Sequence, residues 1–283
     1  MINNVKGLNV LKTSMLESDL LLLGAGKMGG ALLNGWLGNG LDPKNINVVD
    51  PKPSEWLVSL ANTGLNVNLP LSRSPGICII AVKPQMVEEV LSKNFLYYKA
   101  STLFVSIVAG IKLEKLRELL GEKVAIARVM PNTPATIQKG VSCIIANEHV
   151  DENKMKLVEI LFSAVGETIR LENETQMDAV TAISGSGPAY IFYLIEVLAN
   201  TGIELGLDKK LSYRLALLTV SGAGVLAETS KESVNQLRSN VTSPNGTTEA
   251  ALNVLMNSEK GLLPLMREAV KAARVRSEKL GSQ

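Results

Sequence analysis

The chain has 283 residues, of which 46% are hydrophobic and 20% charged, and its formal net charge is +2. This length allows two domains or one large one, and the hydrophobic fraction is ordinary for a soluble protein with a sizeable core. The near-neutral charge, without a basic stripe, gives no indication of a nucleic acid or a membrane surface as partner. Because Cys78 and Cys143 lie in apolar runs and His149 is the only histidine, we expect no disulfide framework and no metal site.

Residues 1–18 precede the first predicted strand. We interpret them as a loosely attached lead-in rather than a targeting peptide, because no long apolar region with a small-residue cleavage site occurs there. No segment combines the length of a membrane span with a near absence of charge, so we expect none. Together with the cysteine usage, these features predict a soluble cytoplasmic protein.

The first regular element is predicted where four leucines from Leu20 run into the sequence GAGKMG. A continuous apolar run that ends at glycines is typical of a strand buried on both faces, and a helix is predicted after it at about 27–37. In this GxGxxG pattern, Gly24 makes the tight turn, Gly26 lets the backbone approach a pyrophosphate, and Gly29 allows close packing of helix on strand. We therefore predict a dinucleotide-binding loop; the alternative is a glycine-rich turn without a ligand.

Strands and helices then alternate along the first half of the chain. We predict strands at 46–50, 66–68, 77–82, 102–108, 123–129, 141–146 and 167–171, and helices at 54–61, 84–91, 112–120 and 153–164. Alternation at these lengths predicts an α/β Rossmann-type, doubly wound and mostly parallel sheet in a domain of residues 1–172. Ligands of such sheets bind beyond the carboxyl ends of the strands.

The second half is helical in pattern from about residue 174, with helices predicted at 175–183, 188–205, 208–230, 234–239, 247–256 and 262–280. The helix at 208–230 is apolar on nearly every side and contains small residues such as Gly222 and Gly224. Such a helix is either central in its domain or buried in a dimer. Residues 173–283 are therefore predicted to form an all-helical domain.

The loop NVTSPNGTTE, which begins at Asn240, places hydroxyls, a turn and a glycine directly before a helix. Thr247 is a candidate N-cap, and Glu249 falls in the first turn. Free N–H groups at a helix start, together with hydroxyls, suit a small carboxylate. The alternative is a capped loop without a ligand.

Five motifs in this order resemble those of the Δ1-pyrroline-5-carboxylate reductase family: GAGKMG at Gly24, AVKP at Ala81, MPNTP at Met130, SGSGPAY at Ser184 and TSPxGTT at Thr242. The resemblance covers nearly the whole chain after the first strand. It implies an oxidoreductase that uses NADPH or NADH to reduce the cyclic imine to L-proline, the final step of proline synthesis. It also implies a homodimer, interlocked through the helical domain, that can assemble further.

The resemblance implies roles for individual residues. The cofactor would contact Gly24, Ala25, Gly26, Lys27, Met28, Gly29, Asn68, Val82, Lys83, Pro84, Ala109 and Asn240. The substrate would contact Ser243, Gly246, Thr247 and Thr248, and the hydroxyl of Thr248 would face the ring nitrogen as the catalytic candidate.

Two positions depart from the family pattern. Asn245 stands where the family usually has a second glycine, and Asn is the residue that best tolerates positive φ after glycine. Asp50 ends the second strand, where NADP-preferring relatives usually carry a small or basic residue. Because a carboxylate there binds a ribose 2′-hydroxyl, Asp50 is a further cofactor-binding candidate that favours NADH, and we expect both cofactors to work.

Two other functions are compatible with a dinucleotide-binding fold. A 3-hydroxyacid dehydrogenase would resemble GSGxxxK at Gly185, but Ile191 stands at the lysine position. A dinucleotide-binding protein without catalytic activity would not need the complete TSPNGTT loop.

Overall fold

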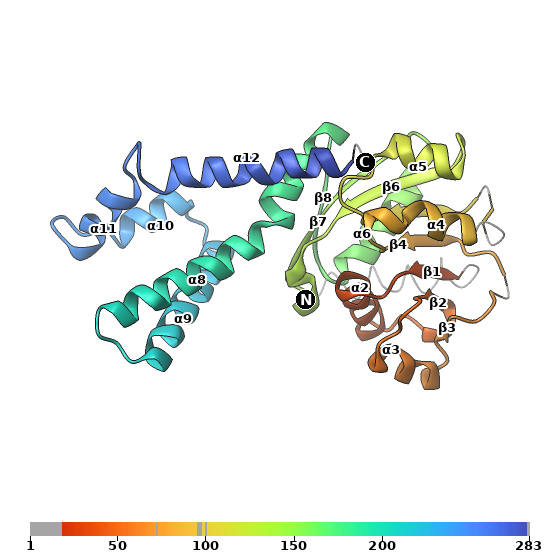
Figure 1. The fold of residues 1–283 in the computed structure, drawn as a ribbon, viewed down its shortest axis with the longest axis horizontal. Coiled ribbons are helices and arrows are strands. Elements are labelled where there is room, and N and C mark those ends of the chain that lie inside the picture. The colour runs from red at the N-terminus through yellow and green to blue at the C-terminus, as the bar shows by residue number, and fades with distance from the viewer. Residues whose placement is uncertain (1–18, 72, 95–97, 100, 282–283) are drawn as a thin grey trace. The chain divides into compact units, whose positions relative to one another are not determined.

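The computed structural model describes residues 19–71, 73–94, 98–99 and 101–281 (Figure 1). The predicted lead-in at 1–18 lies outside the described residues. The chain divides into two compact units. Over the described residues, the first contains 19–185, with the gaps given above, together with 274–281, and the second contains Ser186–Ala273.

The first unit is built on an eight-stranded sheet with the order β3-β2-β1-β4-β5-β6-β7-β8. Its strands are β1 (Leu20–Leu23), β2 (Ile46–Val49), β3 (Asn66–Val67), β4 (Ile77–Ile80), β5 (Leu103–Ser106), β6 (Ala125–Met130), β7 (Gly140–Ala146) and β8 (Gly166–Arg170). Within the described residues, neighbouring strands run parallel except β6 and β7, which are antiparallel. The predicted α/β, mostly parallel sheet is confirmed.

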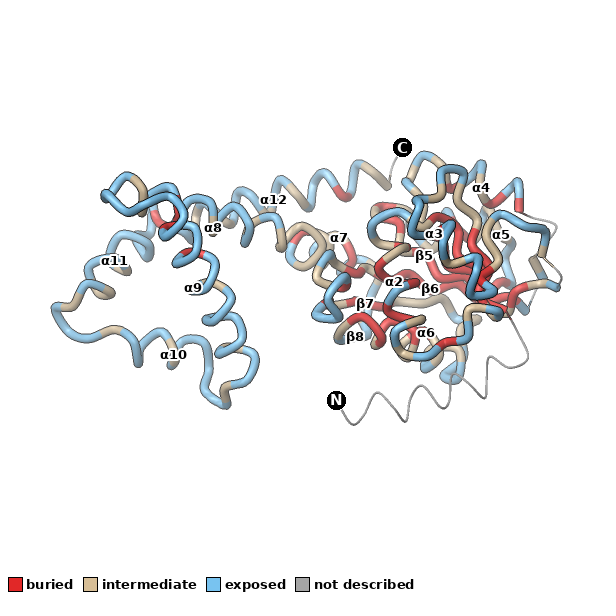
Figure 2. The backbone as a smooth tube through the Cα atoms, turned by 90° about the horizontal axis from the view of Figure 1, so that it is seen from below, coloured by how far each residue is buried: buried red, intermediate tan, exposed pale blue. Residues whose placement is uncertain are grey.

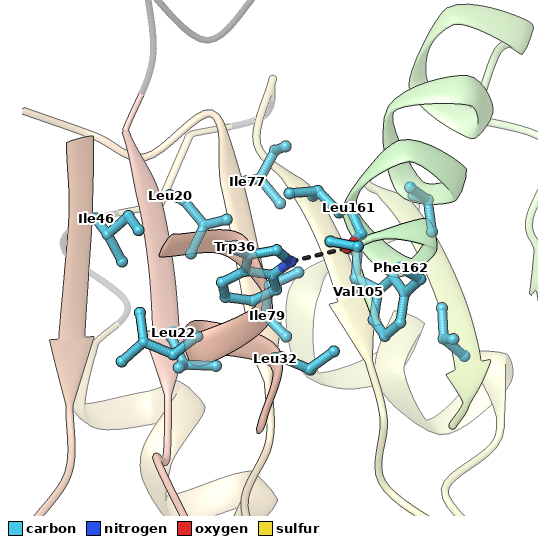
Figure 3. Packing of buried hydrophobic residues seen from close by; sticks show 14 of the residues in the cluster. Leu20, Leu22, Leu32, Trp36, Ile46, Ile77, Ile79, Val105, Leu161 and Phe162 are labelled. Atoms are coloured by element: carbon cyan, nitrogen blue, oxygen red, sulfur yellow. Dashed lines mark hydrogen bonds between the residues drawn. The ribbon is translucent and has the colours of Figure 1, made fainter. Parts of the chain in front are cut away.

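The centre of the sheet explains the unbroken run of leucines. Leu20 and Leu22 point into one buried cluster, and Leu21 and Leu23 point into the other. A strand that is covered on both faces needs apolar side chains at every position. In the first cluster the indole Nε1 of Trp36 donates a hydrogen bond to the carbonyl of Leu161 at 2.9 Å (Figure 3), so this large side chain is buried without an unpaired polar atom.

Helices pack on both faces of the sheet. Residues of α2 (Lys27–Gly38), α3 (Glu55–Ser59) and α6 (Glu152–Ser163) enter the first cluster, whereas residues of α4 (Val87–Lys93) and α5 (Leu113–Leu120) enter the second. Ser54 caps α3, because its hydroxyl accepts a hydrogen bond from the N–H of Leu57. The predicted helix at 175–183 is instead divided into a 3₁₀ turn (Glu174–Gln176), α7 (Met177–Val180) and a π-helical turn (Thr181–Gly185).

The second unit consists of helices over its described residues. These are α8 (Gly187–Glu204), α9 (Lys209–Thr229), α10 (Val234–Asn240), α11 (Thr247–Leu255) and the larger part of α12 (Leu262–Leu280). Helices α8 and α9 pack closely, and the Ser212 hydroxyl donates to the carbonyl of Ala199 at 2.6 Å. Most residues of these two helices are nevertheless exposed in the single chain (Figure 2). They include large apolar residues such as Phe192, which is 58% exposed, and Leu218, which is 57% exposed.

One prediction about this region is wrong. The helical stretch Glu174–Glu204 is long and apolar enough in composition to cross a membrane, although no such segment was expected. Only 11% of its most apolar window is buried within the chain. Length and composition do not distinguish a membrane span from a helix that packs against another subunit.

Candidate active site

The glycine-rich loop between β1 and α2 has the geometry that the GxGxxG pattern predicts. Gly24 has a φ of +90°, and a Cβ there would lie 2.7 Å from the carbonyl oxygen of Ala81. A Cβ on Gly29 would lie 2.2 Å from the carbonyl oxygen of Gly24, whereas a Cβ on Gly26 would meet nothing within 4 Å. The first and third glycines are therefore required by the turn and by packing, and Gly26 leaves backbone open to a ligand.

A cavity of about 610 Å³ adjoins this loop. Its lining residues are Ala25, Gly26, Lys27, Gly30, Ala31, Asn34, Asp50, Lys52, Ser54, Trp56 and Thr136. Helix α2 begins here with no side-chain cap and no acidic residue in its first turn. Its first N–H groups and the positive end of its dipole are thus available to an anion such as a pyrophosphate.

Asp50 lines the same cavity and holds the backbone of its wall through hydrogen bonds. Its carboxylate accepts hydrogen bonds from the N–H of Ala25 at 2.7 Å and from that of Lys52 at 2.8 Å. Asn68, which has a φ of +56°, holds the backbone of Asp50 through its side-chain amide. Asn68 does not line this cavity, so its direct structural effect is on Asp50. The carboxylate oxygens keep further lone pairs with which Asp50 can accept a hydrogen bond from a ligand.

A second cavity of about 250 Å³ lies at the carboxyl ends of β4, β5 and β6. It is lined by Met28, Ala81, Val82, Ile107, Met130, Pro131, Asn132, Thr133 and Gly185. The structure therefore brings the predicted residues Met28 and Val82 together with the MPNTP motif. The position of this motif directly after the predicted strand at 123–129 indicates the same place from the sequence, because ligands of parallel sheets bind beyond the carboxyl ends of the strands.

Of the residues predicted along the nicotinamide side in the first unit, Lys83, Pro84 and Ala109 lie outside these two cavities. Pro84 lines a third cavity, of about 510 Å³, with residues of α4 and α5, and Lys83 and Ala109 line none of the three. Lys83 is exposed and precedes the 3₁₀ turn Pro84–Met86, while Ala109 follows β5.

The predicted substrate loop lies in the second unit, before α11. Gly246, not Thr247, is the N-cap of this helix, and no side chain caps it, so the expectation for Thr247 is wrong. Asn245 has a φ of +58°, as its place in the family's glycine position requires. Its N–H donates to the Glu249 carboxylate at 2.7 Å, which closes the turn onto the helix. Thr248 is half-buried in the first turn.

Asn240, the last residue of α10, belongs to the same unit. Its amide nitrogen donates to the Glu232 carboxylate at 3.0 Å, and its oxygen accepts from the Gln236 amide at 2.7 Å. The second unit thus contains Asn240 and the predicted substrate-binding residues, and the first contains the other predicted cofactor-binding residues.

The glycine turn, the open start of α2 and the cavities at the carboxyl ends of parallel strands define an NAD(P)-dependent oxidoreductase. Residues 20–110 match the family model for NADP oxidoreductases that are coenzyme F420-dependent, and residues 174–280 match the model for pyrroline-5-carboxylate reductase dimerisation. The chain belongs to the pyrroline-5-carboxylate reductase family, which confirms the expected fold class and enzyme class.

Similar proteins support this membership along the chain. The chain is 36% identical to the pyrroline-5-carboxylate reductase of Pseudomonas aeruginosa over 267 residues, which cover 93% of this chain and 97% of that protein. The structure of a pyrroline-5-carboxylate reductase from Coxiella burnetii is similar with a TM-score of 0.85 and 33% identity, covering 93% of this chain and 98% of that one. The structure of a Plasmodium falciparum pyrroline carboxylate reductase with NADP bound is similar with a TM-score of 0.81 and 33% identity, covering 94% of this chain and 98% of that one.

Proposed function

We propose that this protein reduces Δ1-pyrroline-5-carboxylate to L-proline with NADPH or NADH, as the final step of proline synthesis. The observation that carries the proposal is the cavity of about 610 Å³ at the glycine-rich loop, in a chain whose residues 174–280 match the pyrroline-5-carboxylate reductase dimerisation model. The complete TSPNGTT loop within that match supports the imine as substrate.

The residues present fit a dinucleotide. Open backbone at Gly26 and the uncapped start of α2 suit the pyrophosphate. We propose that Ala25, Lys27 and Met28 bind with the loop glycines, and that Asp50 and Asn68 act on the adenosine side. Val82, Lys83, Pro84 and Ala109 are proposed to lie along the nicotinamide side, together with Asn240.

The substrate carboxylate is proposed to bind at the start of α11. Ser243, Gly246 and Thr247 lie at this helix start, where the hydroxyls of Ser243 and Thr247 and the first N–H groups of the helix are available because no side chain caps it. The N–H of Gly246 itself donates to the Ser243 carbonyl at 3.0 Å and holds the turn. The Thr248 hydroxyl would hydrogen-bond the ring nitrogen, orient the imine and retain its proton.

The cofactor supplies the hydride when it is bound. Because the iminium nitrogen can arrive already protonated, the protein does not need a strong general base. Its residues accelerate the reaction mainly by holding the imine carbon in the geometry for hydride transfer.

We propose that residues 1–172 form the cofactor-binding domain and that residues 173–283 form the dimerisation and substrate-binding domain of a cytoplasmic homodimer that can assemble further. The exposed apolar side chains of α8 and α9 support this assembly, because a second subunit would remove them from water. A subunit interface also accounts for the apolar stretch Glu174–Glu204 without a membrane.

The experiment is an oxidation assay with NADPH and NADH, using racemic Δ1-pyrroline-5-carboxylate and its six-membered homologue, with chromatographic detection of the product. Formation of L-proline supports the proposal. Oxidation of a 3-hydroxyacid with NAD(P)⁺, in the absence of proline formation, would instead indicate the dehydrogenase. Cofactor binding with no turnover would indicate a binding protein.

A further inference from the structure

Asn132 lies at the wall of the 250 Å³ cavity, directly after Pro131 at the end of β6. Both the oxygen and the nitrogen of its side-chain amide form hydrogen bonds within the protein. The oxygen accepts a hydrogen bond from the N–H of Val141 on β7 at 2.9 Å, and the nitrogen donates to the carbonyl of Ser184 at 3.1 Å. One side chain therefore joins the end of β6, strand β7 and the turn before α8.

Ser184 lies in the π-helical turn Thr181–Gly185. The wider spacing of a π-turn changes which carbonyls find partners inside the helix, and such turns occur often at functional sites. Here the Asn132 amide supplies the donor for the Ser184 carbonyl from outside the helix. The position of this turn thus depends on a residue 52 positions earlier in the chain.

The next residue, Gly185, forms part of the cavity wall. A Cβ on Gly185 would lie 2.6 Å from the Cε of Met130, so the π-turn and the Met130 side chain pack closely. A shift of Ser184 would move Gly185 with it and would change the space that Met130 occupies.

We propose that Asn132 is a positioning residue for hydride transfer. By fixing Ser184 against β7, it holds the Met130–Gly185 wall of the cavity and so sets where the reacting end of the cofactor rests. The proposal rests on the proposed function, in which Val82, at the same cavity, lies on the nicotinamide side. A positioning defect should lower kcat while the pyrophosphate site at Gly24–Gly29 keeps its affinity, because small misplacements of reacting atoms are costly.

The test compares Asn132→Asp with Asn147→Asp. Asn132→Asp retains an acceptor for the Val141 N–H but loses the donor to Ser184. Asn147 is a matched control, since its amide bridges the N–H of Ile126 at 3.1 Å and the carbonyl of Val124 at 2.8 Å at the opposite end of the same β6–β7 pair. Asn147 lines none of the three cavities.

The measurements are kcat, KM for the imine, the Kd of NADPH by fluorescence, the isotope effect on kcat with NADPH deuterated at the transferred position, and Tm. For Asn132→Asp we expect kcat to fall about ten- to a hundredfold, a larger isotope effect and a change in NADPH Kd of less than about threefold. For Asn147→Asp we expect kcat within about twofold of the parent despite a lower Tm.

Equal losses of kcat in Asn132→Asp and Asn147→Asp would overturn the inference. So would a loss of kcat in Asn132→Asp that is no larger than its loss of affinity for NADPH. If Asn132→Asp does not fold, Gly185→Ala provides the test. Its Cβ comes too close only to the flexible end of Met130, at 2.6 Å, and makes an ordinary contact with Thr181 at 3.7 Å, so the substitution should leave the fold intact. A normal kcat in Gly185→Ala would then refute the proposal that the Met130–Gly185 wall positions the cofactor. A parent protein that forms no proline overturns both the proposed function and this inference, whereas an active parent with an unaffected Asn132→Asp overturns the inference alone.

Discussion

The guanidinium of Arg128 forms an ion pair with the carboxylate of Glu174, and the two side chains are only 5% and 27% exposed. The same carboxylate oxygen accepts a hydrogen bond from the N–H of Leu113 at 2.7 Å, at the start of α5. Glu174 therefore ties β6 and α5 to the segment that follows β8. Removing one partner of such a pair leaves a buried charge without compensation.

Glu174→Ala should accordingly lower the free energy of unfolding by about 2–4 kcal/mol, somewhat less than for a fully buried pair because Glu174 is partly exposed. Glu174→Gln should lose less, since its oxygen can still accept the two hydrogen bonds. Urea unfolding provides the measurement. The control is Glu118→Ala, which breaks an exposed pair with Lys115 and should cost less than about 1 kcal/mol. Equal losses for Glu174→Ala and Glu118→Ala would contradict the prediction.

The Asp50 carboxylate should determine the choice of cofactor. Asp50→Ser removes a charge that repels a 2′-phosphate, so the ratio of kcat/KM for NADPH to that for NADH should rise. It also removes the acceptor for the Ala25 N–H, so KM should rise for both cofactors. Asp42→Ser is the control, because Asp42 accepts a hydrogen bond from the Lys44 N–H but lines none of the three cavities. An unchanged ratio in Asp50→Ser would show that Asp50 does not discriminate between the cofactors.

The apolar surface of the second unit should be the subunit interface. We predict an obligate dimer with more than roughly 2,000 Å² of buried interface, in the size class of permanent complexes. Leu218→Glu, on α9, should weaken dimerisation in sedimentation velocity measurements. Val58→Glu is the matched control, since Val58 is also exposed, at 53%, but lies on α3 of the first unit. A stable and active parent monomer at micromolar concentration would refute the prediction.

Thr248 is the side chain that we place closest to the chemistry. Thr248→Ala should lower kcat by roughly ten- to a hundredfold, the range expected for an orienting hydroxyl that is too weak an acid to be the only proton source. The KM of the cofactor and the Tm should change little, and Thr248→Ser should recover much of the activity. Thr229→Ala, in α9, removes a hydroxyl that bonds only within its helix and should leave kcat unchanged. A near-normal kcat in Thr248→Ala would show that the Thr248 side chain only packs in the helix and takes no part in the reaction.

Local patterns in the sequence determined much of the fold. The leucines of β1, the GxGxxG turn and the Ser54 cap were all predictable, because periodicity, turn conformation and capping depend on residues a few positions apart. The positive φ of Asn245 follows from the same kind of local rule. The motifs also sufficed to identify the family, since their order and spacing do not depend on knowing the contacts.

The tertiary structure decided which distant groups meet. The antiparallel direction of β7, the π-turn at Thr181–Gly185 and the bond from Asn132 to Ser184 have no signal within a short window of sequence. The same is true of Arg128 and Glu174, which are 46 residues apart. Asp50 was expected only to contact a ligand, yet it also holds the Ala25 N–H. The sequence shows which polar side chain stands at a position. The group with which that side chain forms a hydrogen bond or ion pair depends on how the folded sheet brings the ends of distant segments together.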